Sequence, residues 1–261
     1  MIKAKKSLGQ NFLIDRDILE KITKIKSIKN KNILEIGPGT GNLTSFILKN
    51  NPKKFFVIEK DNALAKNLEN LFKDKLTIIN NDILEIDETS LYHEKFIVYG
   101  NLPYNISTEI LIKWITNLKE SFWFEHLILL FQKEVADRII ANFNTAAYGR
   151  ISILANWKLS IEKICDVNPT SFSPRPKINS TLLLFTPKKI FYKIKESKNL
   201  EEITKVFFNH RRKMLKKPFN QLFKGNENIL NKLNINLNLR PQNLNFDTYY
   251  LLAKEYEDLN G

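Results

Sequence analysis

Short apolar runs of strand length alternate with helical stretches through the first two-thirds of the chain, and this order constrains the fold more than any other feature. The apolar runs cover residues 32–36, 55–58, 76–79, 96–99 and 127–131. Apolar side chains at helical spacing fall between them, in residues 42–49, 62–72, 108–118 and 133–142. The pattern predicts an α/β protein with a doubly wound, mostly parallel, Rossmann-like sheet.

The alternation loosens beyond Arg150. Residues 151–157 fit a helix or a strand, and residues 161–167 and 181–185 fit a strand pair around a proline-rich loop. Residues 188–199 are charged and lack a strong apolar pattern, so they are typical of a linker. Helical spacing returns from Leu200 to the end of the chain. We therefore expect two domains, a sheet domain at 1–188 and a small α-helical domain at 189–261.

Positive charge is the one unusual feature of the composition. The chain carries 41 Lys and Arg against 28 Asp and Glu, a net charge of +13. Residues 188–224 hold twelve basic and three acidic side chains, and residues 1–30 hold eight and three. Such an excess indicates a polyanionic partner, although a general enrichment in lysine would give the same total.

Cysteine and histidine are too sparse for two common kinds of site. Cys165 is the single cysteine, and His93, His126 and His210 are far apart in the sequence. This composition excludes an internal disulfide and a Cys/His zinc site, and we expect no metal. The basic N-terminus has no apolar run behind it, and no apolar run approaches the length of a membrane span. We expect a cytoplasmic protein without a membrane partner.

A glycine-rich turn joins the first expected strand to the first expected helix. It reads Glu35-Ile-Gly-Pro-Gly-Thr-Gly41, and Glu59 and Asp82 end the next two strands. Side-chain-free residues at such a turn let a ligand approach the backbone, and a carboxylate at the end of the second strand is placed to bind a ribose diol. The turn alone could be structural. No lysine follows it to bind a triphosphate, so S-adenosylmethionine fits better than NAD or ATP.

A second motif, Gly100-Asn-Leu-Pro-Tyr-Asn-Ile-Ser107, follows the fourth strand, so its side chains belong at the same sheet edge. With this motif the sequence resembles the ribosomal RNA adenine N6,N6-dimethyltransferase family, and within it the bacterial enzymes of the small ribosomal subunit. The resemblance covers nearly the whole chain. Its other blocks are Gly9-Gln-Asn-Phe-Leu13, Glu35 to Thr44, Val57 to Asp61, Pro169 to Lys177 and Phe207 to Leu215.

The resemblance implies a role for each matching residue. The cofactor S-adenosylmethionine is expected to contact Asn11, Leu13, Gly37, Glu59, Asp82 and Asn101. Tyr104 and Phe172 resemble the two aromatic residues that stack on a target adenine. As isolated residues, these two aromatics could equally belong to the core.

The expected reaction explains the residues of the second motif. An exocyclic adenine amine is a poor nucleophile, and two acceptors facing its hydrogens would localise its lone pair. The Asn101 side-chain oxygen and the Leu102 carbonyl, presented by Pro103, are candidates. No general base is expected, because the methylated amine loses its proton readily to water.

Three alternatives remain open at this stage. The chain could be a resistance-type enzyme that methylates an adenine of 23S rRNA, or a noncatalytic nucleic-acid-binding relative. The basic run from Arg211 to Lys217 could be only a solvated helix face. The favoured partner is 16S rRNA in the 30S subunit or its precursor, dimethylated at two adjacent adenosines near its 3′ end, and the protein is expected to be a monomer.

Overall fold

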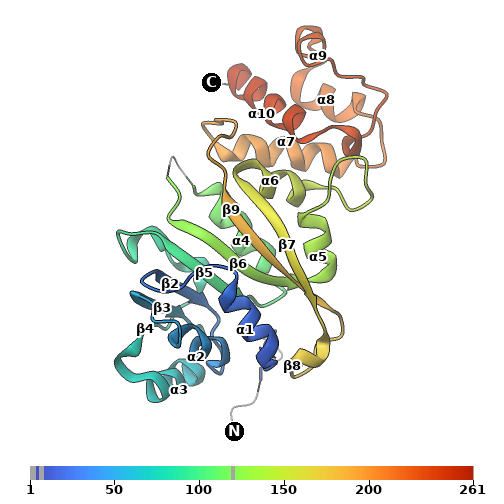
Figure 1. Ribbon diagram of the computed structural model, residues 1–261. Helices are drawn as coiled ribbons and strands as arrows, with labels where there is room; N and C mark the ends of the chain where they lie inside the picture. Colours follow the sequence, from blue (N-terminus) through green and yellow to red (C-terminus); the bar gives the residue numbers. More distant parts are fainter. Residues whose placement is uncertain (1–3, 6–8, 119–120, 261) are drawn as a thin grey trace. The chain divides into compact units, whose positions relative to one another are not determined.

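The structure is a computed structural model that describes residues 4–5, 9–118 and 121–260 (Figure 1). Residues 1–3 and 6–8 of the basic N-terminal stretch therefore lie outside the described residues. Contacts between Cα atoms group the chain into two compact units. Unit 1 comprises Met1–Leu111, Leu118–Ala136 and Ile161–Pro187, and unit 2 comprises Ile112–Asn117, Asp137–Ser160 and Lys188–Gly261. The predicted domain boundary at residue 188 stays a prediction.

A seven-stranded sheet is the centre of unit 1, with strand order β4-β3-β2-β5-β6-β9-β7. Its strands are β2 (Asn32–Ile36), β3 (Lys54–Ile58), β4 (Thr77–Ile79), β5 (Phe96–Asn101), β6 (Phe124–Gln132), β7 (Leu159–Val167) and β9 (Ser180–Pro187). Strands β2 to β6 pair in parallel, whereas β9 pairs antiparallel with β6. The predicted mostly parallel, doubly wound sheet is confirmed.

Helices follow most of the parallel strands, as the alternation predicted. They are α2 (Asn42–Leu48), α3 (Asn62–Phe72), α4 (Ser107–Thr116) and α5 (Lys133–Ile139). Helix α1 (Arg16–Lys24) precedes β2 and was not among the predicted helices. Asp15 and Asp61 cap α1 and α3 by accepting hydrogen bonds from backbone N–H groups of the first turn. These caps explain why the two helices begin where they do.

The ambiguous stretch 151–157 is helical, within α6 (Arg150–Lys158). Helix α5 ends at Ile139, three residues before the expected end. Side chains of α6 bond to its last carbonyls: Ser152 Oγ donates to Arg138 O at 2.6 Å, and Asn156 Nδ2 donates to Ile139 O at 3.3 Å. These bonds satisfy carbonyls that another turn of α5 would otherwise have used.

The strand order places a ligand crevice at the carboxyl ends of β2, β3 and β5. The chain runs from β2 outward to β3 and β4, and then returns to place β5 on the other side of β2. Ligands of doubly wound sheets bind where the order reverses in this way. Gly37 follows β2, Glu59 follows β3 and Asn101 ends β5, so the topology brings the predicted motifs to one edge.

A separate two-stranded sheet pairs the N-terminal block with the proline-rich block. Strand β1 (Phe12–Leu13) runs antiparallel to β8 (Phe172–Ser173), with Leu13 opposite Phe172. Ile14 N extends the pairing by donating to Ser171 O at 2.9 Å. The two segments are about 160 residues apart in sequence, and the local pattern of neither predicted this pairing.

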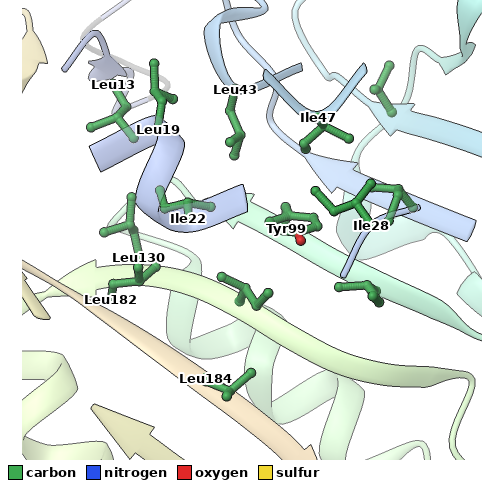
Figure 2. Close-up of a cluster of buried hydrophobic side chains, with 14 of the residues drawn as sticks. Leu13, Leu19, Ile22, Ile28, Leu43, Ile47, Tyr99, Leu130, Leu182 and Leu184 are labelled. Carbon is green, nitrogen blue, oxygen red and sulfur yellow. The ribbon is translucent and has the colours of Figure 1, made fainter. Parts of the chain in front are cut away.

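One core cluster of unit 1 lies between the sheet and helices α1 and α2. Figure 2 shows Leu19 and Ile22 of α1 and Leu43 and Ile47 of α2 among the buried side chains of this cluster. The sheet contributes alternate residues of its strands, since neighbouring residues of a strand face opposite sides: Ile33, Phe55, Val57, Ile97, Tyr99, Ile128, Leu130, Leu182 and Leu184.

Unit 2 is built from helices. Besides α6 it contains α7 (Ser197–Asn209), α8 (Lys216–Phe223), α9 (Glu227–Leu233) and α10 (Phe246–Asn260), and α10 packs against both α7 and α6 (Figure 1). Aromatic rings of Tyr148, Phe207, Phe208, Phe246 and Tyr249 form much of its core. The expected linker, residues 188–199, is irregular only as far as residue 196, because α7 begins at Ser197. Within it, Tyr192 O accepts a hydrogen bond from Trp157 Nε1 at 2.7 Å.

We expect Tyr99→Phe to stabilise the protein. Tyr99 is fully buried, and its hydroxyl is one of three buried side-chain atoms of the described residues without a hydrogen-bond partner. Removing an unsatisfied buried hydroxyl should raise the free energy of unfolding by about 1 kcal/mol, measured by urea titration. The control is Tyr249→Phe, which should lower it, because the Tyr249 hydroxyl donates to Pro241 O at 2.7 Å. A loss of stability in Tyr99→Phe would contradict the prediction.

Candidate functional site

A cavity of about 260 Å³ lies at the carboxyl edge of the sheet in unit 1. The turn after β2, the end of β3, the start of the segment after β4 and the motif after β5 all contribute to its wall. The N-terminal block supplies the remaining side. Its lining includes Asn11, Phe12, Gly37, Gly39, Glu59, Lys60, Asp82, Asn101, Leu102, Pro103 and Tyr104.

The glycine turn needs its glycines for conformation and for space. Gly37 and Gly39 have φ angles of 65° and 59°, in the left-handed region that other residues rarely adopt. A Cβ at Gly39 would also lie 2.7 Å from the Phe12 ring. The turn is therefore shaped to the N-terminal block, whose Phe12 ring packs directly against its backbone.

Glu59 is held by the turn that it faces. One carboxylate oxygen accepts from Gly39 N at 3.1 Å, and the other accepts from Asp61 N at 2.9 Å. Burial raises the pKa of Glu59, while these backbone N–H groups oppose the shift. Each oxygen has a further lone-pair direction, so the carboxylate can accept from a ligand while it holds the turn.

Asp82 lies at the start of a short 3₁₀ turn, Ile83–Glu85. Its Oδ1 accepts from Leu84 N at 3.0 Å, and Lys60 Nζ lies 2.5 Å from its Oδ2. Lys60 is the one cation among the described residues that line the cavity, and it is paired with this carboxylate. Among the described lining residues no cation is therefore free for a phosphate, and Glu59 leaves a net negative charge once Lys60 and Asp82 offset each other.

The Asn101 side chain is oriented by the N-terminal block. Its Nδ2 donates to Asn11 O at 2.7 Å. Because a carbonyl can only accept, the NH₂ group must face Asn11, so this bond leaves the side-chain oxygen available as an acceptor. Asn42 Nδ2 holds the same block by donating to Leu13 O at 2.8 Å.

Pro103 and Tyr104 shape the turn between β5 and α4. Pro103 O accepts from Ile106 N and Ser107 N, at 3.1 and 3.0 Å, as helix α4 begins. Leu102 is buried, so its side chain anchors the turn while its backbone stays at the cavity. The Tyr104 hydroxyl lies 2.5 Å from Ser180 Oγ on β9. The motif is thus a rigid segment at the wall of the cavity.

The ribosomal RNA adenine dimethylase family model matches residues 1–258. The chain is also 62% identical to ribosomal RNA small subunit methyltransferase A of Pelagibacter ubique, over 100% of this chain and 99% of that protein. The chain belongs to the ribosomal RNA adenine dimethylase family. The predicted family, enzyme class and fold class are confirmed.

Other relatives agree with this assignment. The protein with the same description from Wolbachia sp. subsp. Drosophila simulans is 40% identical, covering 99% of this chain and 96% of that one. Among solved structures, a dimethyladenosine transferase from Plasmodium falciparum matches with a TM-score of 0.81 and 26% identity, over 95% of this chain and 98% of that one. The 23S rRNA methyltransferase ErmE matches with a TM-score of 0.69 at 21% identity, over 95% of this chain and all of that one. At 21% identity, the likeness to ErmE shows the fold alone.

Most of the residues predicted for this rRNA adenine dimethylase line one cavity: Asn11, Gly37, Glu59, Asp82, Asn101, Leu102, Pro103 and Tyr104. Leu13 and Phe172 are placed differently, because both belong to the buried core cluster, at 5% and 3% exposure. The pairing of β1 with β8 holds the N-terminal block in place. Contacts of these two side chains with cofactor or adenine stay predictions.

Two residues that the site uses were not among the predicted site residues. Phe12 lies inside the N-terminal block, but only the structure shows its ring against Gly39. Ser180 lies beyond the proline-rich block, and no local pattern links it to Tyr104. In the described parts of the chain, no group of three His, Cys, Asp or Glu side chains is arranged to hold a metal ion. No helix of those parts is long and apolar enough to cross a membrane.

We expect Glu35→Gln to remove a loss of stability that wild type shows as the pH rises from about 4.5 to about 8. Glu35 is buried beneath the glycine turn and accepts from Thr44 Oγ1 at 2.7 Å. Burial raises the pKa of Glu35 from 4.5 to about 8, and the nearby Glu59 charge adds to the shift. The folded state therefore holds this proton where the unfolded chain has lost it, so stability falls as the pH rises from about 4.5 to about 8.

Glutamine keeps the acceptor for Thr44 and cannot ionise. The stability of Glu35→Gln relative to wild type should therefore rise across that pH range, by on the order of 1–4 kcal/mol, in urea titrations at a series of pH values. A difference that stays constant with pH would show that Glu35 ionises normally in the folded protein.

Proposed function

We propose that the protein transfers methyl groups from S-adenosylmethionine to the N6 amines of two adjacent adenosines near the 3′ end of 16S rRNA, in the 30S subunit or its precursor. The observation that carries this proposal is the bond from Asn101 Nδ2 to Asn11 O, because it leaves the side-chain oxygen of this cavity-lining residue available as an acceptor. Family membership supplies the reaction class. The small-subunit substrate is supported by the similarity to the small subunit methyltransferases of Pelagibacter ubique and Wolbachia.

The cavity suits S-adenosylmethionine by its chemistry. That molecule supplies a methyl group on a positively charged sulfur and carries no phosphate. Glu59 and Asp82 give the wall negative charge, and Lys60 is paired, so a cation is favoured over a phosphate ester. We infer that Glu59 accepts from the ribose hydroxyls and Asp82 from the adenine amine of the cofactor. Asn11 and Gly37 line the cavity beside them.

The chain activates the target amine by accepting hydrogen bonds from it. The Asn101 side-chain oxygen and the Leu102 carbonyl oxygen would each accept one hydrogen bond from the amine, which localises the nitrogen lone pair toward the methyl group. Asn101 is held before the substrate arrives by its bond to Asn11 O, and the turn that follows Leu102 is closed by the bonds from Ile106 N and Ser107 N to Pro103 O. Preorganised acceptors lower the barrier because they need no reorientation during the reaction. The proton of the methylated amine then passes to water.

The target adenosine must leave any helix to reach this cavity, since a stacked base cannot present its amine there. Stacking on Tyr104 would offset part of the unstacking cost, at roughly 1–3 kcal/mol for an aromatic ring. Tyr104 is partly exposed at the cavity wall and is available for this contact. Phe172 is buried in this structure, so stacking by Phe172 would require local rearrangement.

The direct test is methyl transfer from labelled S-adenosylmethionine to three substrates in parallel: unmethylated 30S particles, naked 16S rRNA and 50S particles. We expect label in the 30S particles, as N6,N6-dimethyladenosine after digestion of the RNA. Label in 50S particles alone would overturn the small-subunit assignment and favour the 23S-directed alternative. Binding of RNA without any label would favour the noncatalytic alternative.

We expect Asn101→Ala to reduce kcat on 30S particles by on the order of 10²–10³, because one preorganised acceptor is lost. The matched control is Asn42→Ala, which also removes a side-chain bond to the N-terminal block but leaves the acceptor in place. The control should lose much less activity. Equal losses in the two variants would show that Asn101 acts only by holding that block.

We further propose that residues 1–188 carry the methyltransferase activity and residues 189–261 bind RNA. Arg212, Lys213, Lys216 and Lys217 are exposed in unit 2. Arg211 differs from them, because its guanidinium donates to Ala146 O and bonds to Gln242. Arg211 therefore supports the fold, and a test of RNA binding should leave it unchanged.

Changing those four exposed cations to glutamine should weaken 30S binding and flatten its dependence on salt, by somewhat under one unit of slope for each lost phosphate contact. Binding should be measured across a salt series. The control changes four exposed lysines of unit 1, Lys29, Lys54, Lys66 and Lys75, and so removes the same charge. Identical salt lines for the two variants would show that the run is only a solvated face.

A further inference from the structure

The hydroxyl of Tyr104 has a specific, buried partner that the reaction itself does not require. Ser180 Oγ lies 2.5 Å from the Tyr104 hydroxyl, and Ser180 is fully buried. A serine without exposed surface cannot touch a bound RNA. Whatever Ser180 contributes to catalysis must therefore pass through Tyr104.

The backbone around Ser180 is fixed on every side. Ser180 is the first residue of β9 and pairs with Gln132 of β6. On one side of it, Asn179 O accepts from Lys133 N at 2.9 Å. On the other, Thr181 Oγ1 donates to Asp166 Oδ1 at 2.6 Å. The Ser180 hydroxyl is therefore presented from a rigid position.

Tyr104 is held at its other end by the turn into α4. Pro103 O accepts from two backbone N–H groups of that turn, and Ser107 Oγ donates to Tyr104 O at 3.3 Å. The phenol oxygen lies on the long axis of the ring, so a bond to it fixes the direction of that axis. A tyrosine held at both backbone and hydroxyl presents its ring from one position, whereas a phenylalanine could swing about its Cα–Cβ bond.

We propose that Ser180 is a positioning residue for methyl transfer: it anchors the Tyr104 ring so that a stacked adenine holds its amine against the Asn101 and Leu102 acceptors. This inference rests on the proposed function. The anchor acts on geometry, because the reacting nitrogen must be held close to both acceptors and in line with the methyl group. The ring would still stack without the anchor, but over a wider range of positions. The loss should therefore appear in kcat more than in binding of 30S particles.

The test is a double-mutant cycle on kcat with 30S particles, using Ser180→Ala, Tyr104→Phe and the double variant. Each single change removes the same hydrogen bond from a different side and keeps the aromatic ring. We expect each to lower kcat by about two- to tenfold, the size of one neutral hydrogen bond, with no further loss in the double variant. Affinity for S-adenosylmethionine should stay unchanged, and Ser180→Thr, which retains a hydroxyl, should recover activity.

The control is Thr23→Val, which removes a hydroxyl bond within α1, from Thr23 Oγ1 to Glu20 O at 2.9 Å, without touching Ser180, its neighbours or Tyr104. It should lower stability and leave kcat unchanged. An unchanged kcat in Tyr104→Phe would overturn the proposal, as would additive losses in the double variant. If Ser180→Ala does not fold, the kcat of Tyr104→Phe alone tests the proposal. This variant should still fold, because Tyr104 is partly exposed and its ring is retained.

Tyr104→Ala separates this proposal from the proposed function. If Tyr104→Ala loses activity while Tyr104→Phe does not, the stacking role stands and the anchor fails. If Tyr104→Ala keeps full activity, the stacking role itself is wrong.

Discussion

The hydrogen bond from Asn101 Nδ2 to Asn11 O connects the two parts of the chain on which the proposed chemistry depends. It fixes which atom of the Asn101 amide faces Asn11 and leaves the side-chain oxygen available as an acceptor. It also holds the N-terminal block over the crevice, where Phe12 packs on the backbone of Gly39. One interaction therefore couples the wall of the cofactor site to the acceptor proposed for the target amine.

Charge is distributed over the chain in a way that suits two different ligands. The cavity wall carries Glu59 and Asp82, with its single described lysine paired to Asp82. The excess of positive charge lies elsewhere, most densely in residues 188–224. A cationic methyl donor is attracted to the acidic lining and a polyanionic RNA to the basic segment, because each favours the opposite sign.

Sequence reasoning was most successful where the structure follows from local pattern. The strands from β2 to β6 and helices α2 to α4 have the period and order that the apolar residues predicted. The positions of the crevice residues could be predicted from the topology, because the carboxyl ends of parallel strands meet at one edge of the sheet. Motifs at strand ends were therefore placed together without knowledge of any contact.

Interactions between distant segments were not predictable in the same way. The pairing of Leu13 with Phe172 buries both side chains in the core, although the family resemblance placed them at the cofactor and the base. The Ser180–Tyr104 bond joins residues 76 apart in sequence, and serine has no periodicity that would indicate its partner. Arg211 likewise belongs to a basic run, yet its guanidinium bonds to a backbone carbonyl. Each case depends on tertiary contacts that a single sequence does not encode locally.

The most direct test of the central claim is a crystal structure of the protein with S-adenosylhomocysteine and adenosine bound. The acceptor pair predicts that the adenosine N6 lies within about 2.7–3.2 Å of both the Asn101 side-chain oxygen and the Leu102 carbonyl oxygen. The bond from Asn101 Nδ2 to Asn11 O should be retained. An N6 atom out of reach of either oxygen, or an Asn101 amide turned so that its nitrogen faces the adenosine, would contradict the proposed activation of the amine.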